Sequence, residues 1–280
     1  MGEIMVRNVE GYFSGVIRGL APAVLMLTTF LGQTVPSSAS PELPPVILIP
    51  GLEGSALADT NQPNVWAWGR AEGRAHFADL QWPLDKDDDP RFKTAGVLST
   101  WRIGWIFGFS AYEPIQTFLT RNYGLERHSY FEFPYDWRYS NLKTACKLVK
   151  YLDEHATDPS NGESLKQRID RTGVILVGHS MGGIIANLFT HFRAPIGTAT
   201  SPRNPCPHQY KVAMIISLGA PYLGSLDVLK AFVDGPNDLY SHLGVSKEKL
   251  REVVYSFPSL YELAPSYDGC CFSGPNSANI

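Results

Sequence analysis

The stretch VILVGHSMGG, which runs from Val174 to Gly183, places a serine between glycines directly after an apolar run. GVILVG (Gly173–Gly178) has the length and composition of a buried strand, and MGGIIANLFTHF (Met181–Phe192) predicts a helix that begins directly behind it. A sharp strand-to-helix turn needs glycines around the serine, because side chains there would clash. The pattern therefore predicts that Ser180 lies on such a turn, above the carboxyl end of a sheet.

Two backbone N–H groups are candidates for an oxyanion hole beside this serine. The N–H of Met181 would lie at the N-terminus of the predicted helix, where backbone donors point outward. A second donor must come from the loop after an earlier strand, and Leu52 in IPGLEGS (Ile49–Ser55) is the best candidate. The structural alternatives are a glycine-rich turn that only makes room for packing, and an ordinary turn at PGLEG. His179 precedes the serine, so its side chain should point away from the hydroxyl and have a structural role.

Strand-like apolar runs alternate with helical patterns along the chain after Pro45. The expected order is strand, excursion, helix, strand, helix, strand, helix, strand, at 45–51, 55–110, 112–124, 130–138, 141–156, 173–178, 181–192 and 211–221. In the first helix, Ile115, Phe118 and Leu119 share one face. This alternation predicts an α/β protein with a mostly parallel sheet and helices on both faces. Residues 40–280 would form this domain, with 55–110 as a cap-like or lid-like insertion and 211–221 as a buried strand.

The first 39 residues have the features of a targeting segment. LAPAVLMLTTFLG (Leu20–Gly32) is apolar and uncharged, arginines precede it, and small residues that suit a cleavage site end at Ala39. The run is short for a bilayer span, which needs about 20 residues. We expect a secretory signal that is removed after Ala39 and an extracytoplasmic protein. An uncleaved anchor and an ordinary apolar helix are the alternatives.

Composition excludes some functions and leaves others open. A formal net charge of −3 gives no electrostatic reason to bind nucleic acid. The seven histidines and four cysteines lack metal-ligand spacing, so no metal site is expected. The cysteines (Cys146, Cys206, Cys270 and Cys271) could form two disulfides or remain as four buried thiols.

Five motifs extend the comparison beyond the serine turn: PVILIPGLEGSAL, FPYDWR, LVGHSMGG, LGAPYLGS and FPSLYELAP. In this order and spacing, residues 45–265 resemble the lecithin:cholesterol acyltransferase family, which includes lysosomal phospholipases A and phospholipid:diacylglycerol acyltransferases. The resemblance implies an α/β-hydrolase fold and a Ser–acid–His enzyme that cleaves a lipid acyl ester and passes the acyl group to water or an alcohol. It also implies Ser180 as the nucleophile, Leu52 and Met181 as oxyanion donors, and no cofactor. Asp136 and Arg138 of FPYDWR are interpreted as a structural pair, because this fold places its catalytic acid after the serine.

The acid and histidine of a triad are not found in their expected order. After Ser180 the histidines are His191, His208 and His242, and the aspartates that precede His242 are Asp227, Asp234 and Asp238. The Asp238–His242 spacing suits a local contact rather than two loops that converge on Ser180. No strand-like apolar run follows residue 221. We therefore expect an N-terminal part of a longer protein, with the last strands, the acid and the histidine beyond Ile280. A degenerate homologue and an unexpected triad are the alternatives.

The expected substrate is a phospholipid or another lipid ester, and the chain itself is catalytically weak if its base is missing. The aromatic stretch WRIGWIFGFSAY (Trp101–Tyr112) is interpreted either as a buried cap or as a lipid-facing entrance, since aromatic residues favour membrane interfaces. A membrane or lipid-aggregate surface is thus a candidate partner. A soluble lipase or carboxylesterase and a non-catalytic lipid-binding domain are the competing functions.

Overall fold

A computed structural model of the chain describes residues 42–62, 65–69, 77–83, 85–86, 88–103, 107–110, 112–124, 129–155, 164–234, 246–265, 267 and 270. The predicted signal segment, residues 1–39, lies outside these ranges, and so do Asp238 and His242. For residues 101–103 and 107–110 only the backbone is described, so the expected roles of the aromatic side chains in this stretch stay predictions.

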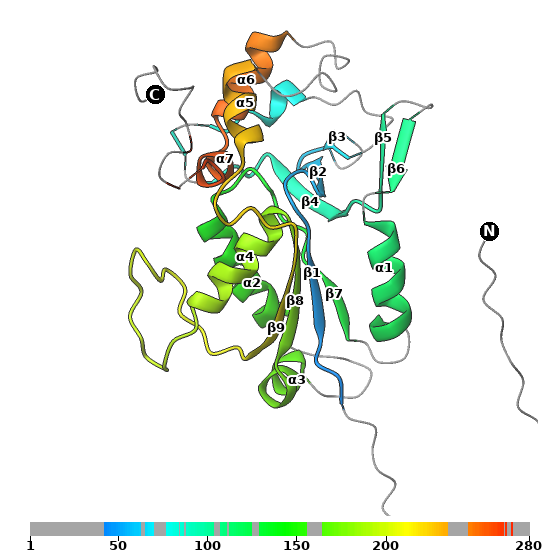
Figure 1. The fold of residues 1–280 in the computed structure, drawn as a ribbon, viewed down its shortest axis with the longest axis vertical. Coiled ribbons are helices and arrows are strands. Elements are labelled where there is room, and N and C mark those ends of the chain that lie inside the picture. The colour runs from blue at the N-terminus through cyan, green and yellow to red at the C-terminus, as the bar shows by residue number, and fades with distance from the viewer. Residues whose placement is uncertain are drawn as a thin grey trace, which may run out of the picture. The chain divides into compact units, whose positions relative to one another are not determined.

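A four-stranded parallel sheet forms the centre of the fold (Figure 1). Its strands, in spatial order, are β7 (Tyr130–Glu132), β1 (Val46–Ile49), β8 (Val174–His179) and β9 (Val212–Leu218). Val46 is in register with Tyr130 on one side and with Ile175 on the other, so β1 lies inside the sheet. The predicted α/β class is confirmed.

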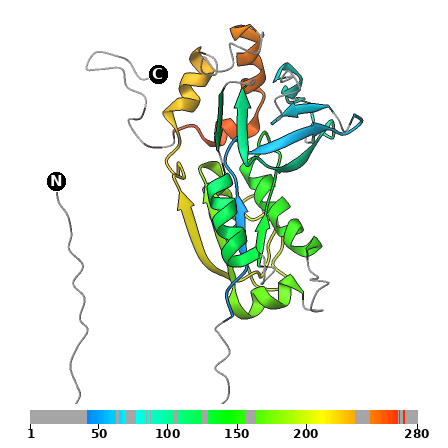
Figure 2. The same cartoon turned by 90° about the vertical axis from the view of Figure 1, so that its right-hand side faces the viewer.

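Helices cover both faces of this sheet. Successive side chains of a strand point to opposite faces, so a strand that is apolar throughout must be covered on both. On β1, Ile47 and Ile49 pack in the main core with helices α2 (Asn141–Glu154) and α4 (Met181–His191). Val46 and Leu48 point the other way and pack against α1 (Glu113–Leu119). Figures 1 and 2 show α1 on one side of the sheet and α2 and α4 on the other.

The three helices that the sequence predicted are present, whereas α3 (Leu165–Thr172) and three helices after β9 were missed. In α2, Ala145, Leu148 and Leu152 are fully buried, as a helical spacing of three and four residues requires. Helix α3 begins with a capping box in which Ser164 and Gln167 satisfy one another's backbone N–H groups. Its charged composition hid it from a search for apolar periodicity.

Two expectations about burial were wrong. In α1 the packed residues are Tyr112, Ile115 and Leu119, which share a face at spacings of three and four, whereas Phe118 points away and is 60% exposed.

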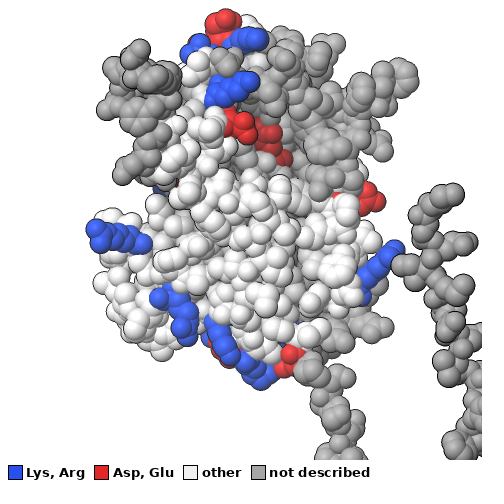
Figure 3. Space-filling model, viewed as in Figure 1, with Lys and Arg blue, Asp and Glu red and all other residues white. Residues whose placement is uncertain are grey.

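The strand β9 is also not fully buried: Met214 is 54% exposed, and several of its other residues are exposed too. It is the last strand in the sheet order, and among the described residues the cluster formed with α1 reaches the other three strands, β7, β1 and β8, but not β9. In Figure 3 the middle of the face over these strands carries no charged side chain among the described residues.

Residues 55–110 form small antiparallel sheets beside the central one. The order β3 (Trp66–Trp68), β2 (Ser55–Asp59), β4 (Phe92–Val97) makes one sheet, and β5 (Thr100–Ile103) pairs with β6 (Phe107–Ser110). A short 3-10 helix, η1 (Phe77–Leu80), lies between β3 and β4. Leu57, Trp68 and Phe77 belong to the main core, so the described part of this segment packs into the domain. Its action as a lid stays a prediction.

After β9 the described chain contains helices alone: α5 (Leu226–Asp234), α6 (Lys247–Tyr255) and α7 (Pro258–Glu262). A one-turn π-helix, η2 (Thr120–Gly124), continues α1. Among the described helices, none combines the length and apolar character that crossing a bilayer requires.

Candidate active site

Ser180 lies in the turn between β8 and α4, as the glycine pattern predicts. Its backbone angles are φ 50° and ψ −123°, a conformation that residues with a Cβ atom rarely adopt. Its N–H donates to Leu218 O at 2.9 Å on the neighbouring strand β9, and its own carbonyl accepts from Gly183 N at 3.0 Å. Such strained residues cluster at functional sites. The hydroxyl-bearing residue is therefore held in place by hydrogen bonds on both of its sides.

The glycines around Ser180 are required by close approach of the backbone. A Cβ atom on Gly178 would lie 2.5 Å from Gly183 Cα, so strand and helix could not meet at this angle. A Cβ on Gly182 would collide with the carbonyl oxygens of Ile49 and Pro50, at the end of β1. The start of α4 is thus pressed directly against the chain that leads into the predicted oxyanion turn.

That turn spans Gly51–Gly54 and is closed by a hydrogen bond from Gly54 N to Gly51 O at 3.0 Å. Glu53 has φ 62°, which lets the chain reverse within these four residues. Leu52 and Ser180 line the same cavity. Met181 begins α4, where the first backbone N–H groups have no acceptor inside the helix. The structure thus brings all three predicted site residues to one place, but it does not test their catalytic roles.

Residues of the FPYDWR motif hold this turn, a role that the sequence did not reveal. Tyr135 Oη donates to Pro50 O at 2.7 Å, and Tyr135 N donates to Ser55 Oγ at 3.1 Å. Trp137 Nε1 donates to Ser55 O at 3.1 Å, and Trp68 Nε1 donates to Glu53 O at 2.8 Å. Tyr135 and Trp137 are fully buried, so these bonds are shielded from water. The turn is therefore fixed by side chains that are distant in sequence.

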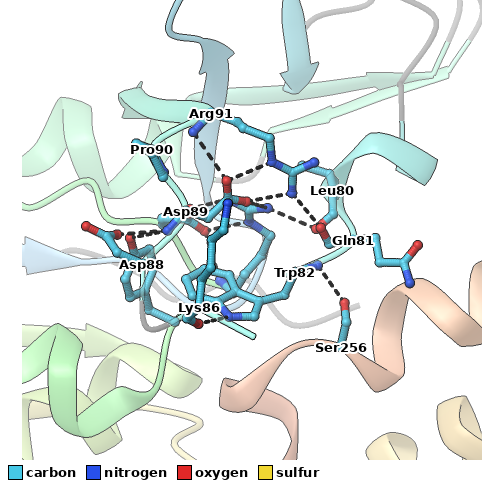
Figure 4. Close-up of polar contacts among 12 residues, drawn as sticks. Leu80, Gln81, Trp82, Lys86, Asp88, Asp89, Pro90, Arg91 and Ser256 are labelled. Atoms are coloured by element: carbon cyan, nitrogen blue, oxygen red, sulfur yellow. Dashed lines mark hydrogen bonds and ion pairs between the residues drawn. The ribbon is translucent and has the colours of Figure 1, made fainter. Parts of the chain in front are cut away.

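Asp136 and Arg138 form the structural pair that was expected. Arg138 Nη2 lies 2.6 Å from Asp136 Oδ2, and Arg138 Nη1 lies 2.8 Å from Asp89 Oδ2. Asp89 also accepts three bonds from Arg91, two from its side chain and one from its backbone N–H, as Figure 4 shows. Burial raises the pKa of Asp89, but the Arg91 hydrogen bonds and both guanidinium charges outweigh it, so its pKa is lowered. The carboxylates of Asp136 and Asp89 therefore each have a cationic partner.

This ionic network supports the wall of the Ser180 cavity. Trp82 N donates to Ser256 Oγ at 2.7 Å, which joins the network's loop to the end of α6 (Figure 4). The ring of Trp82 lies 5.4 Å below the Arg138 guanidinium. Two near neighbours of Ser256 in sequence line the cavity: Phe257 directly after it and Val254 two residues before it.

The cavity beside Ser180 has a volume of about 640 Å³ and a mainly apolar wall. Its apolar lining includes Trp137, Val228, Val254, Phe257, Leu260 and Leu263. Polar groups are contributed by Glu53, Ser225, Asp227 and Lys230. A concave apolar space with a few polar groups beside a serine suits a ligand with a hydrocarbon chain and one reactive polar group.

No histidine is among the described residues that line this cavity. His191 is exposed near the end of α4, with Nδ1 2.8 Å from Asn187 O. His208 is buried, accepts the Tyr210 N–H at Nδ1 and therefore donates from Nε2 to Phe189 O at 2.8 Å. Burial lowers the pKa of His208 and keeps its ring neutral. Both have local structural partners.

The two described candidate acids, Asp227 and Asp234, lie near opposite ends of α5. Asp227 lines the cavity with Ser180, and Asp234 is the last residue of α5. The described residues contain no cluster of three or more His, Cys, Asp or Glu side chains that could hold a metal ion. The location of the acid and histidine beyond Ile280 stays a prediction.

A disulfide joins two of the described cysteines. Cys146 on α2 and Cys206 in the loop before β9 form a disulfide with Cα atoms 5.5 Å apart. The bond links the long connection between α4 and β9 covalently to α2. Sequence spacing left this pairing open.

Fold and site together define an α/β protein in which a strand–serine–helix turn opens into an apolar cavity. The family model for lecithin:cholesterol acyltransferase matches residues 109–275, more than half of the chain. The chain therefore belongs to this family, which confirms the resemblance found in the motifs.

Other comparisons are more distant. No curated protein matches the sequence. The chain is similar to a solved structure described as the Tle4–Tli4 complex, at 16% identity and TM-score 0.45, over 80% of this chain and 54% of that one. It is also similar to the mature form of the Bacillus licheniformis lipase BlEst2, at 18% identity and TM-score 0.35, over 81% of this chain and 60% of that one. The chain thus spans between half and two thirds of these structures.

Proposed function

We propose that the protein forms an acyl-enzyme through Ser180 and cleaves the acyl ester of a phospholipid or another lipid. The observation that carries the proposal is the strained turn that places Ser180 beside the Gly51–Gly54 turn and an apolar cavity. Membership of the lecithin:cholesterol acyltransferase family supports the chemical class. No metal or organic cofactor is needed for this reaction.

In the proposed reaction, Ser180 Oγ attacks the ester carbonyl carbon while its proton passes to a general base. The carbonyl oxygen becomes negative and accepts hydrogen bonds from Leu52 N and Met181 N. The alcohol then leaves with that proton, and water or an acceptor alcohol cleaves the acyl-enzyme by the reverse route. The base in reactions of this kind is usually a histidine, and none is among the described residues that line the cavity.

The cavity supports a substrate with a long acyl chain. Its wall is formed mainly by apolar side chains of α5, α6 and α7, which could surround hydrocarbon next to the serine. Burial of one methylene contributes about 0.8 kcal/mol, or roughly a fourfold increase in apparent affinity. We expect kcat/KM to rise by about this factor per methylene until the cavity is full.

The test is turnover of esters of increasing chain length, as monomers and in phosphatidylcholine vesicles, by wild type, Ser180→Ala and Ser225→Ala. Ser225 lines the same cavity outside the serine turn and is the matched control. Activity that is lost in Ser180→Ala and kept in Ser225→Ala supports the proposal, and equal rates for wild type and Ser180→Ala that exceed the uncatalysed rate by more than about 10⁴-fold refute it. Turnover of short esters with no gain from vesicles would instead indicate a soluble carboxylesterase.

The size of the rate is informative about the base. An oxyanion hole and substrate binding alone leave about 10³–10⁴-fold acceleration when a triad member is missing. A rate well above this range would show that a base lies within the 280 residues and would contradict its expected position beyond Ile280.

A non-catalytic lipid-binding protein is the second candidate, favoured by the lack of a histidine among the described cavity-lining residues. It predicts that wild type and Ser180→Ala bind vesicles equally and that neither releases fatty acid. Vesicle sedimentation together with a fatty-acid assay separates the two functions.

We also propose an extracytoplasmic location with cleavage after Ala39. The Cys146–Cys206 disulfide supports it, because structural disulfides persist mainly in oxidising compartments. Mass spectrometry of the secreted protein should find an N-terminus at Ser40 and both thiols protected from alkylation before reduction. An intact leader and reactive thiols would contradict this proposal.

A further inference from the structure

Tyr112 occupies an unusual position between the two halves of the candidate site. Its hydroxyl oxygen accepts the N–H of Gly51 at 2.8 Å and lies 2.7 Å from His179 Nδ1. Gly51 directly precedes Leu52, and His179 directly precedes Ser180. A single buried hydroxyl thus contacts the residue before the proposed oxyanion donor and the residue before the proposed nucleophile.

The direction of these hydrogen bonds follows from the donors. Because Gly51 N–H must donate, the tyrosine oxygen accepts there, and its own proton is available for Nδ1 of a neutral His179. His179 then carries its proton on Nε2. Burial raises the pKa of Tyr112 and lowers the pKa of His179, so both groups are neutral at pH 7 and this arrangement is the one populated.

Contacts around the hydroxyl leave little room for the turn to shift. A Cβ on Gly54 would lie 2.9 Å from Tyr112 Oη, and a Cβ on Gly51 would lie 2.9 Å from Ser180 Cβ. Both ends of the Gly51–Gly54 turn therefore approach the tyrosine or the serine closely. Tyr112 itself is anchored by its backbone N–H, which donates to Ser99 O at 3.1 Å, and by packing of its ring beside α1.

We propose that Tyr112 is a positioning residue that fixes the Leu52 N–H relative to Ser180 by joining Gly51 to His179. This inference rests on the proposed function, because it assigns Leu52 N–H to the oxyanion. Without the hydroxyl, the buried Gly51 N–H loses its acceptor, and the turn is free to move away from the serine. The effect acts on the transition state, where the oxyanion forms, rather than on substrate binding.

The test compares Tyr112→Phe with Tyr139→Phe. Tyr139 is a matched control, since its buried hydroxyl also accepts a backbone N–H, that of Asp89 at 3.2 Å, and its side chain does not line the Ser180 cavity. Removal of one oxyanion donor lowers kcat by about 10²–10³-fold, so a displaced donor should lower the acylation rate by roughly 10–100-fold. We expect this fall in kcat for Tyr112→Phe with KM changed less than threefold, and wild-type kcat for Tyr139→Phe.

Hydrogen exchange of a peptide that covers residues 49–55 gives a readout that does not need activity. Tyr112→Phe should raise exchange there, and Tyr139→Phe should not. Wild-type kcat and unchanged exchange in Tyr112→Phe overturn the inference, as does an equal loss of kcat in both variants. If wild type is no faster than Ser180→Ala, the proposed function fails, and the exchange data still decide whether Tyr112 fixes the turn.

A second pair of variants applies if Tyr112→Phe does not fold. His179→Ala removes the acceptor of the tyrosine proton, whereas His179→Asn keeps an acceptor close to the position of Nδ1. We expect a lower kcat for His179→Ala and at least partial rescue by His179→Asn. Equal wild-type kcat in both would overturn the inference.

Discussion

Strain at Ser180 leads to a prediction about stability whose sign is unusual. The angles φ 50° and ψ −123° disfavour any residue with a Cβ atom, and such strain amounts to about 1–3 kcal/mol. Alanine keeps this strain, whereas glycine removes it but loses about 0.5–1 kcal/mol through its greater freedom in the unfolded chain. The difference predicts that Ser180→Gly is more stable than Ser180→Ala by up to roughly 2.5 kcal/mol, with a midpoint of about 1 kcal/mol.

The assay is urea unfolding followed by circular dichroism at pH 7, with the Cys146–Cys206 disulfide intact. Lys166 in the helix α3 is exposed and has ordinary helical geometry, so the same pair of substitutions there is the control. At that site glycine should be less stable than alanine by about 1 kcal/mol. If glycine is the less stable residue at both sites, Ser180 is not strained, and the argument for a functional turn loses its main support.

Three further predictions test the surroundings of the site. Gly182→Ala should lower the unfolding free energy by about 1–3 kcal/mol and slow acylation, because the Cβ of the alanine would collide with Ile49 O. Wild-type values in urea unfolding and ester kinetics would contradict this. Arg138→Met should lower the unfolding free energy by about 3–5 kcal/mol at pH 7, since buried Asp136 loses its cation and Asp89 keeps only Arg91. A loss below about 1 kcal/mol would contradict this. His208 has a lowered pKa, so the unfolded chain binds a proton near pH 6.5 that the folded chain does not, and stability falls as pH decreases from 7 to 5. His208→Gln should show a shallower fall in urea unfolding, and an unchanged pH dependence would refute the assignment.

The central strand–turn–helix unit could be predicted from sequence because local and tertiary requirements coincide there. An uninterrupted apolar strand, glycines at the turn and a helix with an apolar face all point to one geometry around Ser180. The helix α2 was predictable for the same reason, with Ala145, Leu148 and Leu152 at core spacing.

Other features depend on contacts that a single sequence does not encode locally. Tyr112 gave no signal of its own, since its importance comes from meeting residues 61 and 67 positions away. Tyr135 and Trp137 lay in a recognised motif, yet their hydrogen bonds to Pro50 and Ser55, on either side of the Gly51–Gly54 turn, required the fold to be seen. The exposure of β9 escaped prediction because an apolar strand sequence does not say whether a helix covers it.

The account depends most on Ser180 as the reactive group, and covalent labelling tests this directly. The 280-residue chain is treated with a fluorophosphonate, digested and analysed by mass spectrometry, with Ser180→Ala and urea-unfolded protein as controls. We predict one adduct, on the peptide that contains Ser180, formed faster than in the unfolded chain and absent from Ser180→Ala. Labelling spread over several serines, or no labelling above that of the unfolded chain, would contradict the assignment.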